Sequence, residues 1–92
     1  MTVSYIVKKV GTYFQVSPEE ITAKSRAARL IIPRFIAIYL ATKNTNLTTK
    51  QLGKQFGGRD HSTIINARKE IEKLLPKDPS IHEDLRQIEA QL

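Results

Sequence analysis

The sequence predicts an all-α domain of about six helices built around a helix-turn-helix. Apolar residues recur at three- and four-residue steps along most of the chain, no segment has the pattern of a strand, and a glycine pair separates two helical segments. With 92 residues and 40% hydrophobic content, the chain fits a single domain over residues 1–92 with one modest core.

Two helices are expected near the N-terminus. The first places one apolar stripe against the core, formed by Val3, Ile6, Val7, Val10 and Phe14. The second is short and begins at Ser17, because Ser17 can cap it, Pro18 suits the first turn, and Glu19 and Glu20 face the positive end of the helix dipole.

A central helix and a last amphipathic helix flank the motif region. Residues 30–40 are apolar nearly all round, which is typical of a helix buried by its neighbours, with Pro33 tolerated near its beginning or at a kink. The segment Asn44-Thr45-Asn46 ends this helix. After Pro76 and Pro79, a final helix presents one apolar face made of Ile81, Leu85, Ile88 and Leu92.

Residues 48–75 have the proportions of a helix-turn-helix. Thr48 and Gln51 match a capping box that begins a short helix up to residue 56. Gly57-Gly58 permits a sharp turn with positive φ, and Asp60 can cap a second helix that runs to residue 75. Because two glycines are common between any two helices, an ordinary helical hairpin is the alternative.

The second helix opens with a polar cluster, which distinguishes it from an ordinary hairpin helix. Its free N–H groups attract phosphate, and the cluster consists of Arg59, Asp60, His61, Ser62 and Thr63. Asp60 can accept a hydrogen bond from the amine of cytosine or simply cap the helix, and both roles are compatible. His61 and Ser62 can meet bases or form a solvated first turn, and Arg59 and Thr63 suit phosphate oxygens or solvent.

The charge of the chain favours a polyanionic partner. Up to residue 75 there are 13 Lys and Arg against 5 Asp and Glu, whereas residues 76–92 have 2 against 4. The whole chain carries a net charge of +6 and has a pI near 9.8. Since many basic proteins bind no nucleic acid, this charge supports DNA binding only together with the motif.

Several other classes of function find no support in the sequence. The chain has no cysteine and only two well-separated histidines, so neither a disulfide nor a metal site is expected. The longest apolar stretch, residues 30–41, contains Pro33 and Arg34 and is too short to cross a bilayer. Without a signal-peptide core, a cytoplasmic location is expected, and no GxxxxGK[ST] loop is present to bind a nucleotide.

The segment GGRDHSTIINARKEI closely resembles the signature of the C-terminal, box-binding domain of the bacterial replication initiator family DnaA. The resemblance covers roughly residues 3–92 and includes Lys24-Ser25-Arg26, Pro33-Arg34, residues 35–40 and 52–56. It implies a Trp-repressor-like helical domain that binds duplex DNA at an asymmetric, TTATCCACA-like DnaA box. The ATPase module that precedes this domain in full-length initiators is not in this sequence.

The resemblance also assigns roles to individual residues. It implies that Asp60, His61 and Ser62 read bases in the major groove and that Arg26 reads the minor groove, while Arg34 contacts the DNA backbone. Ser62 stands where threonine is more usual, which removes a methyl group that could touch thymine. Ala28 and Ile32 stand where the family is often basic, so weaker DNA binding is expected.

The predicted phosphate contacts fix the register of the protein on DNA. They are Arg34, Lys50, Lys54, Arg59, Thr63 and Lys69, whereas Lys73 belongs to a solvated face. Neither metal nor nucleotide is needed for this role.

Three other interpretations remain open. The chain can be a freestanding regulator that occupies such boxes without an ATPase. A nuclease that uses Asp60 and His61 is a second interpretation, but it lacks a nearby second acid. A protein-docking helical module is the third, and it predicts scattered rather than clustered Lys and Arg.

Overall fold

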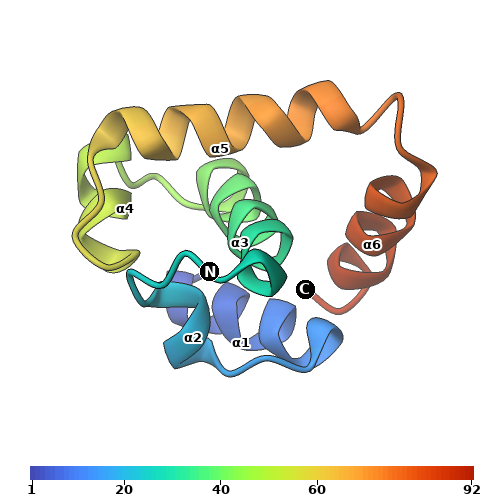
Figure 1. The fold of residues 1–92 in the computed structure, drawn as a ribbon, viewed down its shortest axis with the longest axis horizontal. Helices are drawn as coiled ribbons and strands as arrows, with labels where there is room; N and C mark the ends of the chain where they lie inside the picture. The colour runs from blue at the N-terminus through green and yellow to red at the C-terminus, as the bar shows by residue number, and fades with distance from the viewer.

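The computed structural model describes residues 1–92, and α3 (Ile31–Asn44) runs through the middle of it. Figure 1 shows α5 (His61–Leu74) crossing above α3, with α1 (Val3–Phe14) and α2 (Pro18–Thr22) beneath it. The helices α4 (Thr49–Gln55) and α6 (Pro79–Glu89) lie at opposite ends, and a short 3-10 turn, η1 (Ala28–Leu30), leads into α3. Six α-helices and no strand confirm the predicted fold class.

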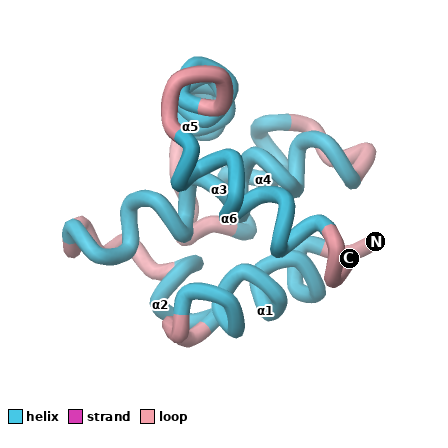
Figure 2. Tube along the Cα trace, turned by 90° about the vertical axis from the view of Figure 1, so that its right-hand side faces the viewer, coloured by secondary structure: helices cyan, strands magenta, loops and turns pink.

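The central position of α3 follows from its sequence. Its residues Ile36, Ala37, Ile38, Leu40 and Ala41 are all fully buried, because α1, α4 and α5 pack around the helix. The view in Figure 2 places α5 above α3, and α1 on the opposite side. Pro33 lies in the first turn of α3, where the helix needs no hydrogen bond from that residue, so it causes no break.

The predicted helix starts are confirmed by their hydrogen bonds. Ser17 and Thr48 each accept from the backbone three residues ahead, and Glu20 and Gln51 each accept a return bond from the cap, which completes two capping boxes. Asp60 and Asp78 cap α5 and α6 with their carboxylates. These local contacts explain why the sequence pattern located the elements well.

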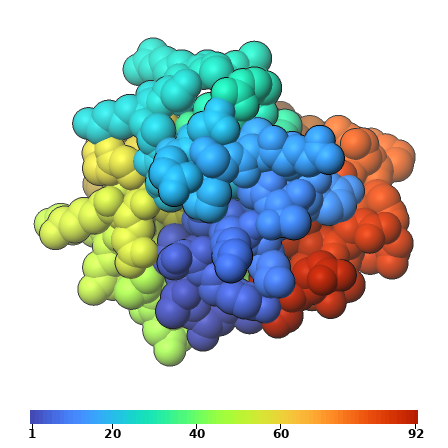
Figure 3. All heavy atoms as spheres, turned by 90° about the horizontal axis from the view of Figure 1, so that it is seen from below, coloured from blue at the N-terminus to red at the C-terminus, as the bar shows by residue number.

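The two ends of the chain pack together on the side of α1 and α6, as the neighbouring blue and red surfaces of Figure 3 show. The Tyr5 hydroxyl donates to the carbonyl of Gln91 over 3.2 Å, and the Tyr13 hydroxyl donates to Asp84 Oδ1 over 2.7 Å. The second bond raises the pKa of Tyr13, because the carboxylate stabilises the protonated hydroxyl. No helix combines the length and the apolar character that crossing a membrane requires.

Candidate nucleic-acid interface

The turn between α4 and α5 is built from Gly53, Phe56, Gly57 and Gly58. The side chain of Phe56 is fully buried and anchors the end of α4. Gly57 and Gly58 have φ values of 82° and 71°, which confirms the predicted positive-φ turn. Arg59 N–H donates to the carbonyl of Gly53 over 2.8 Å, and a Cβ atom on Gly53 would lie 2.1 Å from the Arg59 carbonyl oxygen. The close approach of α4 to the turn therefore requires glycine at residue 53.

The start of α5 presents the predicted base-reading residues to solvent. Asp60 Oδ1 accepts from the Ser62 N–H over 3.4 Å and lies 2.9 Å from Nδ1 of His61. The side chains of Asp60 and His61 are 67% and 61% exposed, and Ser62 is exposed too. When His61 Nδ1 donates to Asp60, Nε2 is the ring atom that remains available for a ligand.

The rest of α5 separates an apolar face from a polar face, as predicted. Ile64, Ala67 and Ile71 are fully buried, whereas Lys69 and Lys73 are exposed and form no ion pair. Thr63 is half-buried at the edge between the two faces. A ligand can therefore approach α5 at its first turn and along the side of Lys69.

A loop that is remote in sequence lies beside the turn, and we call residues 23–27 the arginine loop. Arg59 Nη2 donates to the carbonyl of Ala23 over 2.9 Å, and a Cβ on Gly57 would lie 2.6 Å from the Thr22 carbonyl oxygen. Lys24 and Arg26 of this loop are exposed and form no ion pair. The fold thus brings Arg26, predicted to read the minor groove, to the same side of the molecule as the start of α5.

Arg59 has a structural role that the sequence pattern did not indicate. Its side chain joins the turn to the arginine loop through Ala23, and its Nε atom is buried without a hydrogen-bond partner. The residue as a whole is half-buried. Any phosphate contact of Arg59 therefore uses the guanidinium hydrogens that Ala23 leaves free.

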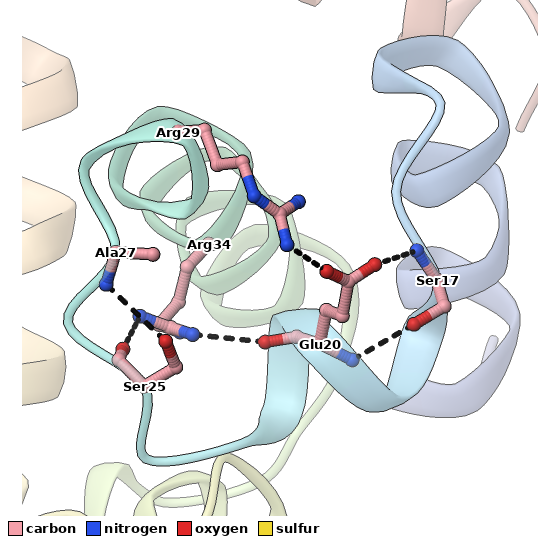
Figure 4. A network of polar contacts seen from close by, with 6 residues as sticks. All are labelled: Ser17, Glu20, Ser25, Ala27, Arg29 and Arg34. Carbon is pink, nitrogen blue, oxygen red and sulfur yellow. Dashed lines mark hydrogen bonds and ion pairs between the residues drawn. The ribbon is translucent and has the colours of Figure 1, made fainter.

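Arg34 lies inside the protein, and this revises the expectation that it contacts the DNA backbone. The residue is only 4% exposed. Its guanidinium donates to the carbonyls of Ile21 over 2.7 Å, Ser25 over 2.7 Å and Glu20 over 2.9 Å. Figure 4 shows two of these contacts, with Ser25 and Glu20 on either side of the guanidinium. Burial, and then the nearby charge of Arg59, lowers the pKa of Arg34.

A signal for the burial of Arg34 was present in the sequence. The residue interrupts a segment that is apolar nearly all round, and a charge on such a helix must find polar partners in the interior. Those partners are backbone carbonyls at the end of α2 and in the arginine loop, which only the three-dimensional arrangement reveals.

The remaining predicted phosphate contacts lie on α4. Lys50 and Lys54 are both exposed, and neither forms an ion pair. No Asp or Glu occurs in residues 21–59, which contain eight Lys and Arg: Lys24, Arg26, Arg29, Arg34, Lys43, Lys50, Lys54 and Arg59. The segment that supplies the loop, α4 and the turn is therefore strongly cationic.

Comparison with known proteins decides the family. A family model described as the bacterial DnaA protein helix-turn-helix matches residues 3–71. The chain belongs to this family. It is also 35% identical over 92 residues to the chromosomal replication initiator protein DnaA of Limosilactobacillus fermentum (strain NBRC 3956 / LMG 18251). That match covers 100% of this chain but 21% of the relative, so the chain spans about a fifth of the length of the curated relative.

The segment matched by the DnaA helix-turn-helix family includes the whole candidate interface. Residues 3–71 contain the arginine loop, α4, the glycine turn and most of α5. The α6 helix lies beyond the matched residues. The resemblance noted from the sequence is therefore confirmed for the part of the chain that holds every predicted site residue.

Proposed function

We propose that this chain is the DNA-binding domain of a replication initiator and that it binds duplex DNA at a DnaA-box-type site, TTATCCACA-like in sequence. The observation that carries the proposal is the position of two groups of residues on one side of the molecule. The exposed start of α5 and the exposed arginine loop meet at Arg59 and Ala23. A duplex that receives α5 in its major groove would meet the loop at the adjacent minor groove.

Each site residue has a specific role in this proposal. Asp60, His61 and Ser62 contact base edges in the major groove, and Arg26 enters the minor groove. The contacts with phosphates come from Lys50, Lys54, Arg59, Thr63 and Lys69. Arg34 is omitted from this set because it is buried and each of its three guanidinium nitrogens donates to a carbonyl within the protein.

The charge arrangement favours this function over a protein-docking module. The exposed lysines of α4 and the arginine loop carry no acidic neighbours within residues 21–59, so their charges are not neutralised locally. Neutralising DNA phosphates with such groups releases counterions, which drives binding. A docking module for proteins gives no reason for this cluster of unpaired cations.

The role in a larger protein is part of the same proposal. The relative is named a chromosomal replication initiator, and the match covers 21% of it. We infer that this chain acts with an ATPase module of such an initiator, in the cytoplasm on the nucleoid, and that it performs no catalysis itself. A freestanding regulator with the same DNA specificity is the second reading of the same site.

Selection of bound sequences from random duplexes tests the proposal. We expect enrichment of an asymmetric site that contains TTATCCACA or a close variant of it, measured at a fixed salt concentration. A matched experiment with Asp60→Asn should relax the selected sequence at one base pair. Recovery of random sequences with the unaltered protein would contradict the proposal.

A further inference from the structure

The arginine loop lacks the backbone hydrogen bonds that usually hold a chain segment in place. No backbone–backbone bond joins Lys24, Ser25 or Arg26 to any other residue. Within the loop, Ser25 Oγ accepts from the N–H of Ala27 over 3.2 Å. A loop with so few restraints would sample many conformations, and an arginine on it would lose entropy on entering a groove.

The guanidinium of Arg34 supplies the missing restraints. It donates to Ser25 inside the loop, and also to Glu20 and Ile21 in the last turn of α2. The carbonyls at a helix C-terminus have no partners within the helix, and a cation there also interacts favourably with the helix dipole. One buried side chain on α3 thus fixes both the end of α2 and the middle of the loop (Figure 4).

This arrangement is costly if its only purpose is stability. Arg34 is 4% exposed, forms no ion pair, and lies close enough to Arg59 for that charge to lower its pKa. Even a buried ion pair is often replaced by apolar residues with little loss of stability, and Arg34 has no acidic partner to offset the cost of burying its charge. The donors of a guanidinium, in contrast, suit three carbonyls that point at one place.

We propose that Arg34 is a positioning residue: by holding the arginine loop, it sets where Arg26 stands relative to the start of α5. This inference rests on the proposed DNA-binding function. Arg59 holds the same loop from the turn through Ala23, so the loop is attached to α3 and to the helix-turn-helix at once. The distance between the minor-groove and major-groove readers is then a property of the fold.

Two variants separate positioning from the other roles of Arg34. Arg34→Met places an unbranched apolar side chain in the same interior position and removes every donor. Arg34→Lys keeps the charge but cannot reach three carbonyls. Each is combined with Arg26→Ala in a double-mutant cycle. Arg26 is expected to read the A·T-rich end of the box, where a narrow minor groove favours an inserted guanidinium. Binding is measured on a box duplex, on duplexes altered at that end, and on duplexes altered at the base pair that Asp60 is expected to read.

We expect both Arg34 variants to lose preference at the A·T-rich end by about five- to tenfold while keeping preference at the Asp60 end. The loss should disappear in the Arg26→Ala background, because Arg34 acts through Arg26. Backbone order parameters of residues 24–27 should fall below about 0.6 in Arg34→Met without DNA. Lys54→Ala is the matched control and should weaken all duplexes alike.

Other outcomes would overturn the inference. Uniform weakening of all duplexes by Arg34→Met, with a salt slope lower by about one, would make Arg34 a phosphate contact. Failure of both variants to fold would make Arg34 a requirement of the whole domain. If Arg26→Ala leaves the base preference unchanged, Arg26 reads no base and Arg34 has no base-reading residue to position. If the unaltered protein shows no preference for a box, the proposed function fails instead, and the order parameters alone decide whether Arg34 holds the loop.

Discussion

Two regions of the molecule differ in how many of their charged groups form ion pairs. One is the arginine loop together with the helix-turn-helix, and the other is the α1–α6 side. On the α1–α6 side, polar groups pair with each other: Lys43 bonds Glu89 over 3.1 Å, Arg86 bonds Glu83 over 2.6 Å, and Tyr13 bonds Asp84. On the other side, Lys24, Arg26, Lys50, Lys54 and Lys69 are exposed without an ion pair. The α1–α6 side therefore pairs several of its charged groups, although Lys8 stays exposed and unpaired, whereas the helix-turn-helix side leaves five cations available for a ligand.

The two regions also differ in how the backbone is used. The helix-turn-helix depends on two positive-φ glycines and on a third glycine that lets the turn touch α4. The α6 helix has instead an aspartate cap, a first-turn proline and an apolar face of Ile81, Leu85 and Ile88. We infer that the geometry of the helix-turn-helix serves a binding surface and that α6 mainly completes the core.

The largest expected effect is a steep salt dependence that belongs to one region only. Between about 50 and 200 mM salt, affinity for a box duplex should fall about a hundredfold or more, because several phosphate contacts release counterions. Lys54→Ala should reduce the slope of log affinity against log salt by about one. Titrations by fluorescence anisotropy measure both quantities.

The α1–α6 side provides the control for this measurement. Arg86→Ala removes the same unit of charge from a residue that is already paired with Glu83, so the slope should stay unchanged. An equal change of slope for Arg86→Ala and Lys54→Ala would show that only net charge matters. The distinction drawn between the two regions would then be wrong.

The next effect tests the turn that supports the candidate interface. A Cβ atom on Gly53 would lie 2.1 Å from the Arg59 carbonyl oxygen, and backbone atoms cannot move aside as a flexible side chain can. Gly53→Ala should therefore lower the free energy of unfolding by about 3 kcal/mol, since overpacking outweighs the better helix propensity of alanine. Urea denaturation measures this change.

Gly58 is the comparison for Gly53, because its φ is positive but a Cβ atom there would meet no backbone atom. Its nearest contact for a Cβ atom is Lys24 Cε at 3.9 Å, so Gly58→Ala should cost only about 1 to 2 kcal/mol for the left-handed backbone. Gly53 has no positive φ, so a Gly53→Ala variant that keeps its full free energy of unfolding would mean that the close approach of α4 to the turn has no energetic importance.

The difference between local and tertiary contacts explains what could be predicted from the sequence. The Thr48–Gln51 capping box and the Gly57-Gly58 turn depend on residues within four positions, and both were predicted correctly. Arg34 depends on carbonyls 9 to 14 residues away, which no helical spacing reveals, so its family resemblance suggested DNA instead. The roles of Asp60, His61, Ser62 and Arg26 toward DNA stay predictions.

A third prediction separates reading from capping at Asp60. Asp60→Asn keeps a side-chain oxygen for the Ser62 N–H, so the helix cap should survive. The variant replaces one carboxylate oxygen by an NH2 group and removes the negative charge that favours the amine of cytosine. This should cost about 1 to 3 kcal/mol of preference at one base pair. Competition binding with single-substitution duplexes measures the preference, and thermal melting measures the cap. Equal losses on specific and scrambled duplexes would make Asp60 a cap only.

The smallest effect concerns pH and compares Glu20 of α2 with Glu83 of α6. The pKa of Glu20 falls from 4.5 to about 2, because its carboxylate accepts from the Ser17 N–H and then because it pairs with Arg29. A carboxyl group with a lowered folded-state pKa stabilises the fold above its unfolded pKa. This contribution is therefore complete above about pH 4.5 and is lost as the pH falls toward about 2.

Glu20→Gln should remove part of this acid sensitivity without removing the capping box, because glutamine can accept the same bond from Ser17. The measurement is the urea midpoint at about pH 6 and about pH 3, and the difference between the two should be smaller in Glu20→Gln than in the unaltered protein. Glu83→Gln is the matched control, since the pKa of Glu83 is also lowered, chiefly by Arg86 within the same helix.

Glu20 instead joins α2 to Arg29 of η1, so its ionisation also bears on how the arginine loop is held. Loss of loop order at low pH in the unaltered protein, but not in Glu20→Gln, would assign that effect to Glu20. Glu83→Gln keeps Glu20 and should therefore lose the same loop order at low pH, whereas an equal loss in Glu20→Gln would indicate a general effect of acid on the whole domain.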